Sequence, residues 1–237
     1  YFRQLRSGRD FAHDDPVAHQ MVNFSYLLGD RQAGTCLVVD PAYDIDGLVA
    51  VAAQDGMEVA GALVTHYHPD HCGGSMMGMR LDGIAELLAR VAVPIHVQRA
   101  EAEFVTKVTG VGADSLAAHD PGDVVTVGDL AVELVHTPGH TPEHLCFMVT
   151  DKGGGADKPM GVATGDFIFV GDIGRPDLLE SAAGLKGQAD SSAHRLYGTV
   201  NKFMQWPDYL QVWPGHGAGS ACGKALGAVP TRTVGYE

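Results

Sequence analysis

The stretch THYHPDHCGG, residues 65–74, places four potential metal ligands within six positions: His66, His68, Asp70 and His71. An apolar run precedes it, and a strand presents alternate residues on one face, so His66 and His68 can point the same way where that strand ends. Pro69 and the two glycines then turn the chain back. This density of imidazole and carboxylate suits Zn, Mn or Fe better than Ca or Mg. Chance histidines in a polar loop are the weaker explanation.

Three further segments repeat this design downstream. HTPGHT (136–141) offers His140, TGD (164–166) offers Asp166, and WPGHG (213–217) offers His216. Each follows an apolar, strand-like run and lies in a turn rich in glycine or proline. Ligands on loops held by a rigid sheet are a common way to build a site. We therefore expect these residues to converge with the first stretch.

The remaining pattern predicts an α/β chain. We expect strands at 19–30, 34–41, 58–66, 94–98, 124–127, 130–136, 144–150, 160–166 and 209–217. We expect helices at 44–56, 79–91 and 189–206. Both halves carry strands and helices, which allows a four-layer sandwich of helix, sheet, sheet and helix. With no linker or repeat in view, residues 1–237 are expected to form a single domain.

Composition narrows the functional classes. The 237 residues carry a formal net charge of −13, which disfavours a nucleic-acid partner. No apolar run has the length of a membrane span, and no signal-peptide pattern opens the sequence. The four cysteines form no CxxC pair, as in reduced intracellular proteins. We therefore expect a cytoplasmic protein that binds neither nucleic acid nor membrane.

HxHxDH at 66–71, together with TPGHT, TGD and PGHG, resembles the metallo-β-lactamase superfamily over nearly the whole chain. The resemblance implies a four-layer αββα sandwich with a metal site at one edge of two sheets. It also implies one site from His66, His68 and His140, a second from Asp70, His71 and His216, and Asp166 as the bridge between them. No motif position falls on five other histidines: His13, His19, His96, His119 and His194. His136 and His144 are close enough to the site to support it, and a small side chain in a tight turn explains Cys72 as well as ligation does.

The segment TGDFIFVGDIGRPDLLE (164–180) is similar to the persulfide dioxygenase type of this superfamily, with Arg175 and Asp177 at matching positions. That similarity implies one Fe(II) per chain, bound by His66, His140 and Asp166, and oxidation of a small thiol persulfide by O₂ to sulfite. Asp70 and Arg175 are the candidate catalytic residues. Asp172, by contrast, is explained by a turn.

The tail from 210 to 237 resembles the subset in which rhodanese domains follow such a domain. A rhodanese-like domain would then lie beyond Glu237, and a rhodanese-type sulfurtransferase is a possible partner. The chain could also form a homo-oligomer.

The ligand inventory also fits a dinuclear thioester hydrolase of the glyoxalase II type, with one or two Zn(II). His68, Asp70, His71 and His216 would then be ligands, or further ligands, of a second metal. A non-catalytic metal–sulfur carrier is a third hypothesis, which open coordination positions disfavour. The thiol carrier stays open among glutathione, coenzyme A and other small thiols.

Overall fold

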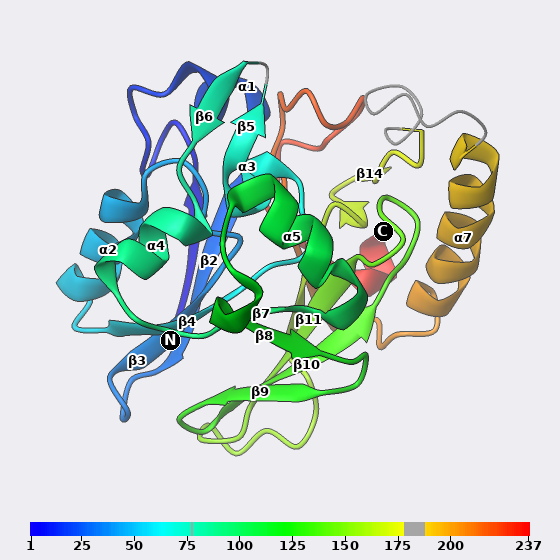
Figure 1. The fold of residues 1–237 in the computed structure, drawn as a ribbon. Helices are drawn as coiled ribbons and strands as arrows, with labels where there is room; N and C mark the ends of the chain where they lie inside the picture. The colour runs from blue at the N-terminus through cyan, green and yellow to red at the C-terminus, as the bar shows by residue number, and fades with distance from the viewer. Residues whose placement is uncertain (77, 178–187) are drawn as a thin grey trace.

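The computed structural model describes residues 1–76, 78–177 and 188–237. Two six-stranded sheets stack face to face with helices on both outer faces, which confirms the α/β, four-layer αββα prediction (Figure 1). The first sheet has the order β1 (Phe2–Arg6), β2 (Phe24–Asp30), β3 (Thr35–Val39), β4 (Glu58–Leu63), β7 (Ile95–Gln98), β8 (Leu116–His119). The second has the order β16 (Arg232–Thr233), β15 (Gln211–Pro214), β12 (Gly161–Gly165), β11 (Leu145–Asp151), β10 (Leu130–His136), β9 (Val124–Val127).

Helices cover the two outer faces unequally. The first sheet packs against α1 (Pro16–Met21), α2 (Ile45–Gln54), α4 (Ile84–Arg90) and α5 (Ala102–Thr109), through one shared apolar cluster. The second packs against α7 (Gln188–Phe203), which lies apart on the right in Figure 1. Shorter pieces complete the chain: α3 (Pro69–Cys72), two small hairpins, β5 (Gly74–Met76) with β6 (Met79–Leu81) and β13 (Ile168–Phe169) with β14 (Asp172–Ile173), and the 3₁₀ turns η1 (Arg99–Glu101), η2 (Ala113–Ser115) and η3 (Val234–Tyr236).

Strand alternation separates the central core from the outer one. In β11, Phe147 packs between the two sheets, whereas its neighbours Cys146 and Met148 face the α7 side. In β10, Leu134 and Val135 divide in the same way. Successive side chains of a strand point to opposite faces, so one strand serves both cores. Burying a side chain such as Phe147 contributes about 1.5–3 kcal/mol relative to leaving it exposed.

Several predicted elements are confirmed closely. The hairpin turn falls at Gly128-Asp129, and Leu130 pairs with Val127 across it. Gly128 has φ +55°, a left-handed value that glycine adopts without strain. The side chain of Asp44 caps α2 by accepting a hydrogen bond from the amide of Gly47.

Other boundaries were wrong. The expected strand at 19–30 begins only at Phe24, because the Asp15 side chain caps α1, which starts at Pro16. The expected helix at 79–91 is divided into β6 and α4, since Glu86 accepts the Gly83 amide and starts the helix there. β1, α5 and β8 were not predicted at all. β1 and β8 are too short to show a clear alternation and depend on their neighbours in the sheet, whereas the amphipathic pattern of α5 was overlooked.

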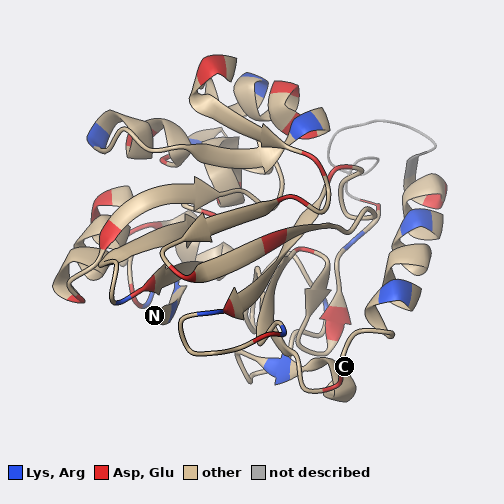
Figure 2. Cartoon of the chain, turned by 90° about the horizontal axis from the view of Figure 1, so that it is seen from below, with Lys and Arg blue, Asp and Glu red and all other residues tan. Residues whose placement is uncertain are grey.

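Charged residues lie mainly on outer helices and loops in the view of Figure 2. α7 carries both signs there, with Asp190 near its start and Lys202 near its end. Among the described residues, no helix is both long and apolar enough to cross a membrane.

Candidate metal centre

The seven predicted ligands meet at one edge of the sandwich. His66 and His68 follow β4, Asp70 and His71 lie on α3, and the other three follow β10, β12 and β15: His140, Asp166 and His216. β12 and β15 run parallel, so their carboxyl ends bring Asp166 and His216 to the same edge. The sequence prediction of convergence is therefore met for the whole set.

Three imidazoles form what we call the first position. Nδ1 of His68 lies 3.0 Å from Nε2 of His66 and 3.1 Å from Nε2 of His140. Asp166 adds its Oδ2, which is 3.5 Å from Nε2 of His140. These four residues come from three turns, after β4, β10 and β12, and the ring of His66 is fully buried.

The second position consists of Asp70, His71 and His216 with the other oxygen of Asp166. Nε2 of His71 and Nε2 of His216 are 3.2 Å apart, and each lies 3.2 Å from Asp166 Oδ1. Oδ2 of Asp70 is 3.6 Å from His71 Nε2 and 3.5 Å from His216 Nε2. Asp166 thus presents one oxygen to each position, as expected of a bridging residue.

Hydrogen bonds to the outer ring nitrogens fix which lone pairs face inward. Nδ1 of His140 donates to the Arg175 carbonyl (3.1 Å), and Nδ1 of His71 donates to Asp40 Oδ2 (2.8 Å). Nδ1 of His216 donates to the Met21 carbonyl (2.7 Å). Because carbonyl and carboxylate oxygens only accept, these three rings carry their proton on Nδ1, which leaves the Nε2 lone pair directed inward.

His66 follows the same rule through Thr65. The Thr65 hydroxyl donates to Asp40 Oδ2 at 2.7 Å, so it accepts from His66 Nδ1 at 3.0 Å. The inward atoms are therefore electron-pair donors, crowded at 3.0–3.6 Å from one another.

This donor set fits divalent metal ions. Ligands about 2.0–2.1 Å from a tetrahedral cation lie roughly 3.3–3.4 Å from each other, close to the separations seen here. Oδ1 of Asp166 is buried and has no hydrogen-bond partner among the described residues, although two ring nitrogens are near. A buried carboxylate oxygen without a hydrogen bond is costly unless a cation neutralises it.

The electrostatic environment agrees with that fit. Burial lowers the pKa of His66 well below its usual value, and burial with nearby His140 lowers the pKa of His68 to about 3. Burial alone would raise the pKa of Asp166, but His216 and His71 hold it well below its ordinary value. Neutral rings and an ionised carboxylate, as at the first position, are the forms that bind metal. At the second position burial alone would lower the pKa of His71 and His216, but Asp166 raises both pKa values well above the usual one, so a cation that binds there displaces protons.

Asp40 and His144 support the ligands from behind. Asp40 accepts the amide and hydroxyl of Thr65 at 2.8 and 2.7 Å and also holds His71. His144 Nε2 accepts the backbone amide of Asp166 at 3.1 Å, as its proximity in sequence suggested. Asp40 was missed by sequence reasoning, although its place after the apolar run of β3 is the same signal that marked the ligands.

Backbone strain gathers behind the second position. Val22, Asp40 and Tyr43 all have positive φ, at 51°, 50° and 70°. Such conformations cost about 1–3 kcal/mol each for residues other than glycine and tend to occur at functional sites. Here they direct three polar groups toward the ligands, namely the Asp40 carboxylate, the Tyr43 hydroxyl and the amide of Asn23, which follows Val22.

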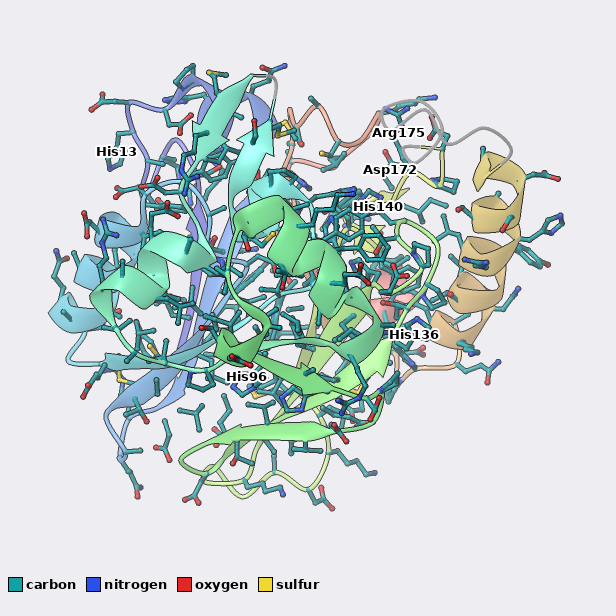
Figure 3. All side chains as sticks on the ribbon, in the orientation of Figure 1. His13, His96, His136, His140, Asp172 and Arg175 are labelled. Atoms are coloured by element: carbon teal, nitrogen blue, oxygen red, sulfur yellow. The ribbon has the colours of Figure 1, made fainter. Side chains whose placement is uncertain are left out.

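Arg175 reaches the site through its backbone. Its carbonyl holds His140, while its guanidinium, 34% exposed, pairs with Asp177 through two contacts of 3.1 and 2.5 Å. Asp172 accepts the amides of Lys224 and Ala225 at 2.8 and 3.0 Å and is not grouped with the ligands. In Figure 3 the labels of Arg175, Asp172 and His140 lie close together, to the left of α7.

The unassigned histidines lie elsewhere or contact other groups. His96 pairs with His119 at 2.9 Å, and His136 contacts the Pro142 carbonyl at 2.8 Å. In Figure 3, His13 and His96 are labelled far from His140. Cys72 is buried at the end of α3 and is not grouped with the ligands, which favours the first of its two explanations. The missed cysteine is Cys222, whose sulfur lies within 4.8 Å of ligand atoms of Asp166 and His216.

Comparison with known proteins places this geometry in a family. The metallo-beta-lactamase superfamily profile matches residues 20–216. A hydroxyacylglutathione hydrolase from Rhodopseudomonas palustris is 35% identical over 71% of this chain and 59% of its own length. The crystal structure of a metallo-beta-lactamase from Staphylococcus aureus superposes with a TM-score of 0.79 at 34% identity, covering all of this chain and 60% of that one.

A third likeness concerns the fold alone. The structure of ETHE1 from Myxococcus xanthus gives a TM-score of 0.67 at 21% identity, covering 99% of this chain and 80% of that one. The chain thus spans about three fifths of the length of the two more similar proteins. With the profile matched over most of its length, the chain belongs to the metallo-beta-lactamase superfamily.

Proposed function

We propose that this chain is an iron-dependent persulfide dioxygenase that oxidises a low-molecular-weight thiol persulfide. The observation that carries the proposal is the segment that follows Asp166. Its Gly-Arg-Pro-Asp motif, which resembles that enzyme type, is built into the first position, because the Arg175 carbonyl holds the ring of His140. Asp177 in turn holds the Arg175 side chain.

His66, His140 and Asp166 would hold one Fe(II) per chain. When bound, Fe(II) supplies the redox chemistry that O₂ requires and that Zn²⁺ cannot supply. The overall reaction balances as RSSH + O₂ + H₂O giving RSH and sulfurous acid, which ionises to sulfite. The terminal sulfur is oxidised, the S–S bond is broken, and O₂ is reduced.

The residues of the chain would bind, orient and accept protons. The guanidinium of Arg175 is partly exposed and can attract an anionic persulfide carrier, although the chain as a whole is acidic. Asp70, an ionised carboxylate beside the reacting centre, would accept the proton that the persulfide or water releases. The buried rings limit access of bulk water to the first position.

The test uses one iron-loaded sample and two assays. Glutathione persulfide should drive oxygen uptake in an oxygen electrode with sulfite as product, and replacement of iron by zinc should abolish it. S-lactoylglutathione should be cleaved slowly or not at all without oxygen. Thioester cleavage without persulfide-dependent oxygen uptake would overturn the proposal.

A second candidate is a glyoxalase II-type hydrolase with one or two Zn(II). The second position, with its complete set of ligands, and the 35% identity to a hydroxyacylglutathione hydrolase favour it. A metal-activated water would then attack a thioester carbonyl, and oxygen would not be needed.

The proposed partners of the chain are a small thiol persulfide and O₂. The carrier, whether glutathione, coenzyme A or another thiol, can be identified by comparing their persulfides in the same oxygen assay. A rhodanese-type sulfurtransferase that supplies the persulfide and a homo-oligomeric state also remain proposals.

A further inference from the structure

The two cation positions differ in their surroundings. The side-chain nitrogen of Asn23 lies 3.1 Å from Oδ2 of Asp70 and 3.5 Å from Nε2 of His71, two ligand atoms of the second position. Within the described segments, the ligand atoms of the first position make polar contacts only among themselves and with Asp166. A hydrogen-bond donor of the protein therefore competes at one position and not at the other.

The amide of Asn23 is held in one orientation. Its oxygen accepts the Tyr43 hydroxyl at 2.6 Å, and its nitrogen donates to the Asp70 carbonyl at 3.0 Å. The Asn23 nitrogen contacts two oxygens of Asp70, and both only accept hydrogen bonds here. The NH₂ group of Asn23 must therefore face the second position. Asn23 is 3% exposed, which leaves water little chance to replace these contacts.

The position of Asn23 is also fixed by the backbone. The residue forms an isolated bridge with His216, and Gly217 donates its amide to the carbonyl of Val22 at 2.9 Å. Val22, with φ 51°, turns the chain so that the next side chain enters the site. Asn23 therefore cannot move away without disturbing the loop that carries His216.

Competition follows from the number of lone pairs. The two amide hydrogens of Asn23 are used by the Asp70 carbonyl and by Asp70 Oδ2. The hydrogen bond to Oδ2 occupies one lone pair of that ligand and draws electron density away from a cation bound there. A hydrogen bond to a charged group has a net strength that corresponds to roughly a tenfold to hundredfold effect on an equilibrium.

We propose that Asn23, oriented by Tyr43, is a positioning residue that makes the second position the weaker of the two. This inference rests on the proposed function, which needs only one cation per chain. It would explain how a chain with ligands for two cations works with one at His66, His140 and Asp166.

The test measures metal binding and not activity. Metal-free wild-type protein and an Asn23→Leu variant are titrated with Zn(II) against a chelator, and bound zinc is counted. We expect one tight zinc in both, and a second zinc that binds on the order of tenfold more tightly in the variant. Tyr43→Phe should have a smaller effect in the same direction, because it removes the hydroxyl that orients the Asn23 amide but leaves the amide itself in place.

Asn201→Leu is the matched control. Asn201 is exposed on α7, where its side chain contacts only the Tyr197 carbonyl, so both zinc affinities should stay at the wild-type values. If Asn23→Leu does not fold, Asn23→Asp serves instead. It keeps an oxygen for Tyr43, replaces the amide donor with a carboxylate, and should strengthen the second zinc still more.

Two results would overturn the inference. If Asn23→Leu binds the second zinc ion more weakly than wild type, the amide orients Asp70 as a ligand. If the affinity for the second zinc ion is unchanged, the amide has no influence on it. Two Mn(II) ions bound on either side of Asp166 should give a spin-coupled spectrum, which provides an independent count. Failure of the proposed function would appear separately, as wild-type protein without persulfide-driven oxygen uptake.

Discussion

The ring of His140 is held by the backbone of Arg175, whose carbonyl accepts its Nδ1 proton at 3.1 Å. Asp166 and Arg175 belong to one segment that leaves β12 and folds back on itself, with the Gly174 amide donating to the Phe167 carbonyl at 3.0 Å. One loop therefore supplies the bridging ligand and also orients a second ligand. Any change that opens the loop should affect both.

Gly174→Ala should open the loop that joins Asp166 to Arg175. A methyl group at this position would lie 1.7 Å from the carbonyl oxygen of Asp166, which is backbone and cannot rotate away. We expect loss of more than half of the bound metal and a clearly lower melting temperature, measured by elemental analysis and calorimetry.

Gly198→Ala is its matched control. Gly198 lies inside α7 with no atom near the added methyl, and alanine favours a helix by about 0.5–1 kcal/mol over glycine. That variant should keep its metal and melt slightly higher. Equal metal content in the two variants would contradict the proposed role of the loop.

Asp166→Ala and Asp172→Ala should behave differently, although both aspartates follow a glycine in the same segment. The first removes an oxygen from each cation position and should abolish stoichiometric metal binding. The second removes hydrogen bonds to the amides of Ile173, Lys224 and Ala225 and touches no ligand, so metal should remain while stability falls by about 1–2 kcal/mol. Elemental analysis and urea unfolding provide the two readouts, and similar metal loss in both would refute the distinction.

Arg175→Lys tests the side chain apart from the backbone. The substitution keeps the carbonyl that holds His140 but loses the planar, two-point contact of a guanidinium. We expect unchanged metal content and a KM for persulfide raised about threefold to tenfold, because the anion loses a partner. Asp177→Asn, which releases the guanidinium from its ion pair, should not raise KM. Metal loss in Arg175→Lys would instead assign the side chain a purely structural role.

The ligands could be predicted from sequence because they lie in glycine- or proline-containing turns that follow strands, or in the short helix α3 that continues the first of these turns. His140, Asp166 and His216 are far apart in sequence, and parallel β12 and β15 bring two of them together. Among the residues that support the ligands, Asp40 carries the same signal after β3 and was overlooked, whereas Asn23 carries none. Asn23 was assigned to the middle of a strand, and the left-handed turn at Val22 that brings it into the site has no glycine to mark it.

In the fold, too, elements with a local sequence signal were predicted and elements that depend on tertiary contacts were not. The β9–β10 hairpin was predicted to the residue because its turn and alternation are local. The second half of α1, residues 19–21, was assigned to a strand, since a six-residue helix shows little periodicity and depends on the cap from Asp15 and on burial of Val17 and Met21. Short elements of this kind are decided by their neighbours in three dimensions.

The last prediction concerns pH and uses His96, which is remote from the ligands. Burial, with a further contribution from His119, lowers the pKa of His96 to about 4, against 6.5 for an exposed ring. As pH falls through 6.5 the unfolded chain takes up a proton that the folded chain refuses, so stability from the neutral ring is present above 6.5 and is lost toward pH 4. His96→Gln cannot be protonated and should lose less stability between pH 7 and pH 5 than wild type. After allowance for the partial exposure of the ring, the difference should be about 1 kcal/mol. Urea unfolding at the two pH values measures it, with exposed His194→Gln as control, so that changes in metal binding common to all variants cancel. Parallel pH dependence in wild type and His96→Gln would show that the His96 ring is not held neutral by its surroundings.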